Sequence, residues 1–498
     1  MGMVLNTNIP SIQAQRALGE SRKEMELAME RLSTGSRINS AGDDAAGLAI
    51  VERMNTQIRG LNQATRNAND GIALIKTVEN ALVEVSGMLQ RMRELAVQAA
   101  NDTNTATERA FADNEITSLQ KEISRVSLNT RYNGAQILNG SFSAKSLQVG
   151  TEAGETLDFS IGNVESSKLG AYVVDGLTQA AQKGANTGES DYSSAVSDAD
   201  ITITSSSASR TVDVETTDSA KTVAKKINAI AASTQVVASA RTYAWLYTPT
   251  ANPSVQARLK FVGPTGVVTE TASFTLTSND VSDAIQKINA ISATTGVQAS
   301  STGDYKVLLT ENNGNDITIM NSSARTDLDV KAVGIDGVTA DSTEISLDAA
   351  SSSSAEDTAV VRGNIKLTSN NDFTVNQSTN DEFFSNGIQS APLIDVSSIS
   401  VATRTKASNA LAIIDGAIET VSSMRGSLGS LQNRLDYTVS NLLKVTEFTT
   451  AARSRIADAD FAAETARLAK AQVLQQAGAS MLSQANASTD TVLQLLRG

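Results

Sequence analysis

Residues 75–99 read IKTVENALVEVSGMLQRMRELAVQA, and apolar side chains recur in this stretch at steps of three and four. These positions are Ile75, Val78, Leu82, Val85, Leu89, Met92, Ala96 and Ala99. The spacing places one apolar stripe along an α-helix. The helical pattern extends back to Ala45 without a proline. It predicts a rod of about 55 residues, roughly 80 Å long at ~1.5 Å per residue.

The two ends of the chain carry the same rhythm. Near the N-terminus it falls on Leu18, Arg22, Met25, Met29 and Leu32, and near the C-terminus on Leu474, Gly478, Met481, Ala485, Ser488, Val492 and Leu495. A single amphipathic helix has nothing on which to bury its stripe. We therefore expect the ends to pack on each other and on neighbouring copies of the chain. The packing residues predicted for this core are Leu18, Met25, Met29, Leu32, Leu474, Met481, Ala485, Val492 and Leu495.

Two further helices are indicated. Turn-forming residues from Asn101 to Thr105 interrupt the first rod, and a shorter helix marked by Ile116, Leu119, Ile123 and Val126 then runs back along it. From about Ala402 the helical pattern returns, and one heptad frame holds from Ala407 to Leu442. The matched stripes predict a long antiparallel bundle closed by both halves of the chain.

Short sequence motifs predict the structure of the segments that connect the helices. Tyr132-Asn133-Gly134 and Asn139-Gly140 are turn sequences, and the alternating stretches 146–149 and 157–161 predict a β-hairpin region. Asp43 and Asp44 directly precede the long helix, where carboxylates accept hydrogen bonds from free N–H groups. The alternative is a carboxylate pair that binds a metal. Capping is favoured because the neighbouring sequence offers no further acidic ligands.

Residues 176–400 have a different composition, rich in Ser, Thr, Asp, Gly and Val, with many short alternating segments. Within them, residues 226–230 and 287–291 both read KINAI. Strand-like runs precede and follow each copy. The pattern indicates two related β-helix-β units within a β-rich surface insert of the bundle. A Ser-rich stretch, 349–355, is expected to be an exposed loop.

Composition excludes several classes of function. The 498 residues include neither histidine nor cysteine, which removes the commonest general base and the usual zinc ligands. A Ser-His-Asp enzyme or a zinc hydrolase is therefore excluded, and we expect no cofactor and no catalysis. The net charge of −13 argues against nucleic acid or an anionic membrane as the main partner. No cleavable signal peptide and no membrane-spanning run are expected from the sequence.

Four separated motifs resemble the bacterial flagellin family. They are the opening Leu5-Asn6-Thr7-Asn8, the stretch LSTGSRINSAGDDAAGL at 32–48, the run QRMRELAVQ at 90–98, and the end from AQVLQQAG at 471–478 to Leu-Leu-Arg at 495–497. The resemblance covers about 1–175 and 400–498. In the middle of the chain only the two Ile-Asn-Ala-Ile elements resemble a repeat that occurs in flagellin inserts.

The resemblance implies a structural subunit that polymerises with itself into the flagellar filament for swimming. It implies export by the flagellar type III apparatus, an extracellular location, and an export chaperone, a cap protein and hook-junction proteins as partners. The implied fold is α+β and multidomain. The expected ranges are an inner coiled-coil helix 1–32, a connector 33–44, bundle helices with β-hairpins 45–175, the insert 176–400, a bundle helix 401–455 and a second inner helix 460–498.

The family also implies recognition by the vertebrate Toll-like receptor for flagellin, through Gln90, Arg91, Leu95, Gln98 and Glu122. Arg91 and Leu95 are each one step from the stripe and are expected at the flank of the bundle, with Glu122 beside them on the shorter helix. These residues also serve filament packing. Two alternatives stay open: a hook-filament junction protein, which shares the terminal patterns, and a filament subunit whose Ser/Thr-rich insert is an adhesin or bears glycans.

Overall fold

A computed structural model describes residues 8–101, 103–183, 199–249, 254–264, 266–323, 328–347, 357–378 and 381–497. The chain forms two compact units. Unit 1 comprises Met1–Lys76, Ala144–Phe159 and Gly429–Gly498, and unit 2 comprises Thr77–Ser143 and Ser160–Leu428. The α+β class is confirmed, with long helices from both ends of the chain and a strand-rich insert. The residue ranges expected for the domains remain a prediction, because the unit boundaries fall inside two long helices.

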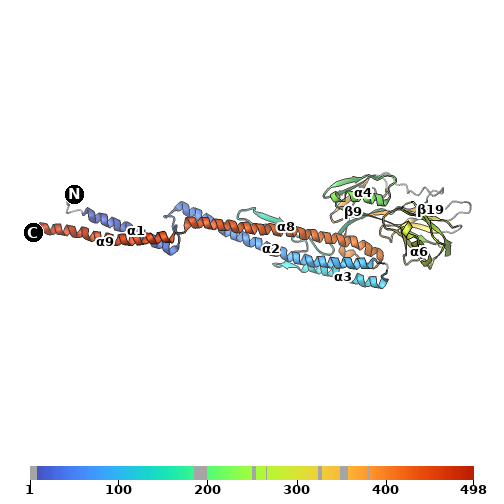
Figure 1. Ribbon diagram of the computed structural model, residues 1–498, viewed down its shortest axis with the longest axis horizontal. Coiled ribbons are helices and arrows are strands. Elements are labelled where there is room, and N and C mark those ends of the chain that lie inside the picture. The colour runs from blue at the N-terminus through green and yellow to red at the C-terminus, as the bar shows by residue number, and fades with distance from the viewer. Residues whose placement is uncertain are drawn as a thin grey trace. The chain divides into compact units, whose positions relative to one another are not determined.

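Two antiparallel helices from the chain ends, α1 (Ile9–Thr34) and α9 (Phe461–Arg497), lie side by side in unit 1 (Figure 1). Asn8 caps α1 by accepting the Ser11 N–H through Oδ1 at 3.1 Å, and Gly35 ends the helix with a left-handed φ of 71°. The Arg37 N–H then donates to the Ala457 carbonyl, and the Ala459 N–H to the Gly35 carbonyl. These bonds join the chain leaving α1 to the chain entering α9.

The predicted rod is α2 (Ala45–Ala99), and it begins at the expected residue. Asp44 caps it, since its Oδ1 accepts the Gly47 N–H at 2.8 Å. Asp43 does not cap the helix, because its Oδ2 accepts the N–H groups of Asn39 and Ser40 within the connecting loop. These bonds, that of Ser40 foremost, lower the pKa of the Asp43 carboxyl. Unit 1 also holds the predicted hairpin, β3 (Lys145–Gln148) and β4 (Thr156–Phe159), with Leu147 opposite Leu157.

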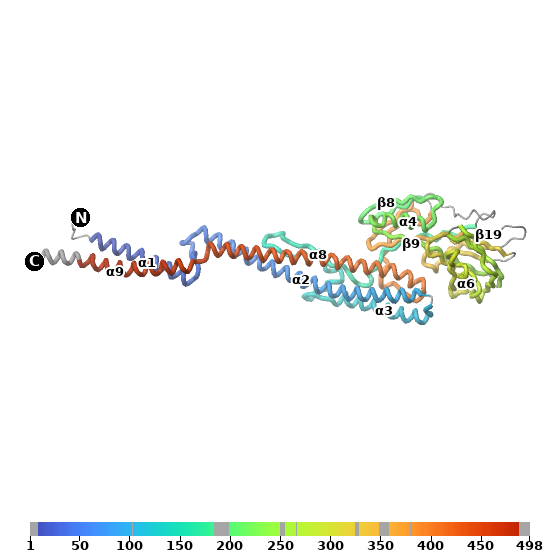
Figure 2. Tube along the Cα trace, in the orientation of Figure 1, coloured from blue at the N-terminus to red at the C-terminus, as the bar shows by residue number. Residues whose placement is uncertain are grey.

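The C-terminal bundle helix is α8 (Arg404–Ala457), and its predicted heptad frame is buried every seventh residue. In unit 2 it lies beside α2 and α3 (Ala106–Asn129), as the trace in Figure 2 shows. Arg93 on α2 pairs with Asp415 on α8 at 2.6 Å, and Arg425 on α8 pairs with Glu79 on α2 at 2.8 Å. The turn Asn133-Gly134, with φ of 48° and 82°, joins β1 (Arg131–Tyr132) to β2 (Ala135–Gln136).

The insert consists of antiparallel sheets in unit 2. The largest has the order β14-β15-β9-β20-β5-β23, with β17 also paired to β9 and β18 to β17. Its strands are β5 (Gly170–Asp175), β9 (Val236–Tyr247), β14 (Val297–Ser301), β15 (Val307–Glu311), β17 (Asp329–Val333), β18 (Ala340–Ser346), β20 (Asn364–Ser369) and β23 (Leu393–Asp395).

Three smaller sheets complete the described part of the insert. One has the order β12-β11-β16-β19-β6, another β22-β21-β7-β8, and the third pairs β10 with β13. The strands are β6 (Gln182–Lys183), β7 (Ile201–Ser205), β8 (Ser209–Val212), β10 (Ser254–Ala257), β11 (Leu259–Val262), β12 (Val268–Glu270), β13 (Phe274–Thr277), β16 (Ile317–Asn321), β19 (Asp357–Val361), β21 (Phe373–Gln377) and β22 (Gly387–Ser390).

The two KINAI copies form matching structures. Each begins in the last turn of a helix, α4 (Ala220–Ala229) or α6 (Ser282–Asn289), and is followed by a short helix, α5 (Ala231–Thr234) or α7 (Ser292–Thr295), and a strand. The Asn228 side chain makes two hydrogen bonds to the backbone of Ala238, both of 2.8 Å. Asn289 makes the same two bonds to Ala299, at 2.9 and 2.7 Å. The repeat therefore preserves a polar link between helix and strand.

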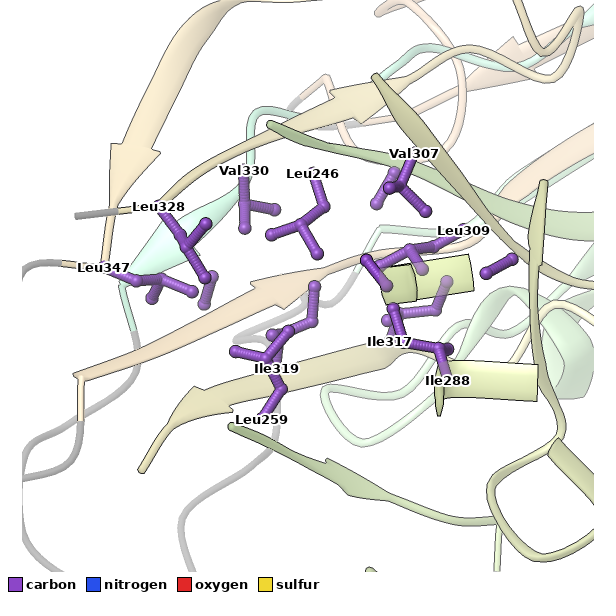
Figure 3. Packing of buried hydrophobic residues seen from close by; sticks show 14 of the residues in the cluster. Leu246, Leu259, Ile288, Val307, Leu309, Ile317, Ile319, Leu328, Val330 and Leu347 are labelled. Carbon is purple, nitrogen blue, oxygen red and sulfur yellow. The ribbon is translucent and has the colours of Figure 1, made fainter. Parts of the chain in front are cut away.

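Each repeat belongs to its own hydrophobic core. Ile227 lies in a core with Val223, Ile365 and Phe384, while Ile288 lies in a second core with Leu246, Ile317 and Leu309. Figure 3 shows the second core, where side chains from β9, β11, β15, β16 and α6 converge. Strand β9 contributes to both cores, its first half to one and its second half to the other. The Ser-rich stretch 349–355 lies outside the described residues.

The insert leaves the bundle through two paired strands, β5 and β23, with Tyr172 opposite Leu393 and Gly170 opposite Asp395. The two ends of the insert therefore lie next to each other. Helix α8 crosses β5 at Gly416, where an added Cβ would lie 2.8 Å from both the Gly170 carbonyl oxygen and the Ala171 Cβ. Only glycine permits this approach of helix and strand backbones.

Candidate assembly surface

The contact between α1 and α9 combines small side chains with leucine and methionine. The α1 residues that are buried or half-buried are Ser11, Ala14, Leu18, Ser21, Met25, Ala28, Arg31 and Leu32, and those of α9, up to residue 487, are Glu464, Leu468, Ala471, Gln475, Gly478, Leu482 and Ala485. We call these two sets the paired faces. Both follow steps of three and four, apart from the additional Arg31, as coiled-coil helices do. An added Cβ on Gly478 would lie 3.0 Å from Leu18 Cγ, so the helices are close there.

Polar contacts fix the register of this pair. The Asn8 side chain donates to the Ala485 carbonyl at 3.1 Å, and Ser11 Oγ donates to Asn486 Oδ1 at 3.0 Å. At the other end Arg31 pairs with Glu464 at 3.3 Å, and both side chains are largely buried. Arg467 also reaches Glu464, at 2.9 Å. Burying charge is costly unless it is paired, so these contacts favour one alignment of the two helices.

Further apolar side chains on the same helices are exposed. We call this set the free apolar face. It consists of Ile9, Ile12, Leu27 and Met29 on α1 and of Phe461, Val473, Leu474 and Met481 on α9. Met481 is 65% exposed and Leu474 43%. Exposed apolar groups in such numbers are typical of a surface that binds another protein.

The predicted packing residues are divided between the two faces. Leu18, Met25, Leu32 and Ala485 lie on the paired faces, whereas Met29, Leu474 and Met481 lie on the free apolar face. The side chains of Val492 and Leu495 lie outside the described residues. The sequence pattern missed Ser11, Ala14, Ser21, Ala28 and Ala471, although their three-four spacing was a usable signal. Whether the predicted residues pack between copies stays a prediction.

The residues expected to meet a receptor lie in unit 2. Gln90, Arg91 and Gln98 are exposed on α2, and Glu122 is half-buried on α3. Arg91 Nε donates to Glu115 Oε1 on α3 at 2.8 Å, and Arg91 also pairs with Glu94 at 3.0 Å. Glu115 foremost raises the pKa of the Arg91 guanidinium. Glu122 pairs instead with Arg125, which lowers the pKa of its carboxyl.

Two details differ from the sequence expectation. Leu95 is only 3% exposed and does not lie at the flank of the bundle. The reason is that α2 has neighbours on two sides, α3 and α8, so its buried arc includes Leu95 as well as the stripe residue Ala96. Glu122 lies seven residues beyond Glu115, or about 10 Å along α3. The side chain that meets Arg91 is Glu115, which the sequence analysis did not single out.

The described residues offer no cluster of acidic side chains that could hold a metal ion. Among the helices that the structure describes, none contains an apolar stretch long enough to cross a membrane.

Comparison with known proteins identifies the family. A model of the bacterial flagellin N-terminal helical region matches residues 5–143, and a model of the C-terminal helical region matches residues 411–496. B-type flagellin of Pseudomonas aeruginosa is 35% identical over the full length of both chains. The chain belongs to the bacterial flagellin family. Flagellin B of Vibrio cholerae, at 31%, and a flagellin of Salmonella rubislaw, at 33%, also match over the full length of both chains.

Solved structures give weaker likenesses. FliC from Burkholderia pseudomallei is 17% identical, with 73% of this chain and 99% of that chain covered and a TM-score of 0.29. The flagellar hook associated protein-3 from Legionella pneumophila is 11% identical, with 82% and 98% covered and a TM-score of 0.33. Family membership rests on the sequence matches. As a flagellin, the chain is a structural protein of the extracellular flagellar filament.

Proposed function

We propose that this chain polymerises through the free apolar face of α1 and α9 into a filament that drives swimming. The observation that supports the proposal is that both terminal helices keep exposed apolar side chains outside the paired faces. The paired faces are used inside the chain, whereas these side chains remain exposed. A partner would bury them, and a second copy of the chain supplies matching helices in a symmetric assembly.

The same proposal includes the route and partners that the family suggests. The chain would leave the cell through the flagellar type III apparatus with an export chaperone, and add to the filament beneath a cap protein, above the hook-junction proteins.

A substitution on the free apolar face tests the proposal. Met481→Asp should leave the monomer folded, because the side chain is 65% exposed. It should block assembly, because an interface would then bury an unpaired charge and lose an apolar contact worth ~1.5–3 kcal/mol, or roughly tenfold or more in critical concentration. Sedimentation and negative-stain electron microscopy of salt-induced polymer give the readout.

Met481→Leu is the matched control, because it preserves an apolar side chain of similar volume. It should polymerise nearly as well as the parent chain. If Met481→Asp formed filaments at the parent's critical concentration, the free apolar face would not be the assembly surface. A hook-filament junction protein would differ in another way, since the parent chain itself would then fail to form long filaments.

We propose, second, that the monomer is recognised by the host Toll-like receptor for flagellin. Support comes from the exposed side chains of Gln90, Arg91 and Gln98 on one stretch of α2, with Glu122 on the adjacent α3. Leu95 would support this surface from beneath rather than contact the receptor. Filament packing remains the primary role of these helices, and recognition follows from surfaces that the monomer exposes.

A further inference from the structure

A small polar pocket lies in unit 2. Its volume is about 140 Å³. Arg241 and Tyr243 on β9 and Leu308 and Thr310 on β15 line one side. Because Tyr243 is directly opposite Thr310 in the sheet, these side chains share one face of it. Arg404 and Ser408, from the first turns of α8, line the other side.

The unpaired charge of the pocket is that of Arg241. Arg404 also lines the pocket but has an interaction of its own, and the lining includes no Asp or Glu. Arg241 donates to Ser408 Oγ at 2.9 Å and to Tyr243 Oη at 3.4 Å, both neutral hydroxyls. Within the described chain no carboxylate forms an ion pair with Arg241. This is unexpected in a protein with 54 acidic and 41 basic residues, in which carboxylates are plentiful.

The nearest carboxylate on β15 is already engaged. Glu311 follows Thr310 and therefore points to the opposite face of the strand. Its oxygens accept from the backbone N–H groups of Asn313 and Asn315, at 3.0 and 2.7 Å, and from both of their side-chain amides. Glu311 is thus unable to neutralise the pocket. The positive end of α8, which begins at Arg404, adds to the positive potential.

We propose that this pocket binds a small oxyanion, with Arg241 as the principal ligand and the hydroxyls of Tyr243, Thr310 and Ser408 as further hydrogen-bond partners. A guanidinium presents paired N–H donors that match carboxylate, phosphate or sulfate oxygens. Bound there, the anion links β9 of the insert to the start of α8. It stabilises the junction at which the insert meets the bundle.

The chain supplies its own reporter. Trp245 is the single tryptophan, and it packs in one cluster with the pocket residues Tyr243 and Leu308. Its indole N–H therefore gives one resonance in a proton–nitrogen NMR spectrum of the full-length monomer. Titration with inorganic phosphate, at ionic strength held constant with potassium chloride, should shift this resonance to a plateau. The plateau distinguishes binding at a site from general ionic screening.

Arg241→Gln removes the charge and most donors, and should weaken phosphate binding by roughly tenfold or more, the usual worth of a charge-assisted hydrogen bond. Arg241→Lys should bind with intermediate affinity. The matched control is Arg210→Gln, which removes an exposed arginine from β8 elsewhere in the insert and should leave the titration unchanged. Circular dichroism verifies that each variant is folded.

Sulfate and acetate distinguish the kinds of oxyanion. If sulfate competes with phosphate and acetate does not, the result supports a tetrahedral ligand. If acetate competes as well, the result supports any oxyanion, including a side-chain carboxylate of another protein. The proposal would be overturned by a shift that never saturates in the parent chain, or by equal affinity in the parent and Arg241→Gln. If Arg241→Gln fails to fold, Ser408→Ala replaces it, and unchanged affinity in that variant together with Arg241→Lys overturns the proposal.

Discussion

At the scale of single residues, neighbours along α2 differ in what they face. Arg91 and Arg93 are both 49% exposed and each pairs with an acidic side chain. Arg91 faces Glu115 on α3, whereas Arg93 faces Asp415 on α8. The two residues therefore form a test pair, because they match in charge and exposure and each makes an ion pair with a neighbouring helix, while the surfaces that they occupy differ.

We expect Arg91→Ala to reduce signalling by monomer through the receptor by roughly thirtyfold, since truncation of a central arginine costs ~2 kcal/mol or more at an interface. Arg93→Ala should retain nearly the parent potency. The measurement is the dose response of receptor-bearing cells to monomer, with circular dichroism to verify folding. Equal potency of Arg91→Ala and the parent would show that this surface is not the one recognised.

Leu95 is a poorer test of recognition. Since its side chain is buried, Leu95→Ala opens a cavity that typically costs ~2–5 kcal/mol of stability. A loss of signalling from that variant could arise from a disturbed bundle. The sequence could not show that Leu95 is buried rather than exposed, because one apolar stripe predicts one neighbouring helix and α2 has two.

At the scale of elements, the sequence predicted the helices from their periodicity, but it did not predict which helices and strands pack against each other. The heptad frame of α8 and the start of α2 at Ala45 follow from spacing and capping signals that lie within each helix. The choice of the face of α9 that is buried depends instead on α1, whose Leu18 side chain packs against Gly478. The sheet pairings are more distant still: β20 pairs with β9, with Thr368 opposite Val237, and no local pattern indicates such a partner.

The crossing of α8 over β5 predicts opposite effects on stability for alanine substitutions at two glycines of α8. Alanine in a helix is favoured over glycine by roughly 0.5–1 kcal/mol, and Gly426 has open space around the position of a Cβ, so Gly426→Ala should stabilise the chain. At Gly416 the new methyl would overlap the β5 backbone, which costs ~1–3 kcal/mol. Gly416→Ala should therefore be destabilising.

Hydrogen exchange locates the effect. In Gly416→Ala the amides of the β5–β23 pair should exchange faster, while in Gly426→Ala they should be unchanged. Thermal unfolding, monitored by circular dichroism, shows whether each substitution stabilises or destabilises the whole chain. Stabilisation by both substitutions would mean that α8 and β5 are further apart in solution than in this structure.

At the scale of the whole molecule, the insert and the proposed assembly surface belong to different compact units. The free apolar face belongs to unit 1, whereas the insert with both its cores belongs to unit 2. The sequence indicated this separation through a change in composition near residues 176 and 400. It did not indicate how the ends of the insert meet, which the pairing of β5 with β23 supplies.

Replacing residues 176–391 by a short Gly/Ser linker should therefore leave a chain that still forms filaments. This deletion retains β5 and β23, which pair at Tyr172 and Leu393. The linker therefore has only a short gap to span. Val174 of β5, which lies in a core of the insert, would become exposed, and reduced solubility is expected. The comparison is a chain truncated after residue 459, which keeps the insert and loses α9. Electron microscopy should show filaments from the first chain and none from the second. Filaments from the truncated chain, or their absence from the insert-deleted chain with its helices intact by circular dichroism, would mean that assembly depends on the insert rather than on the terminal helices.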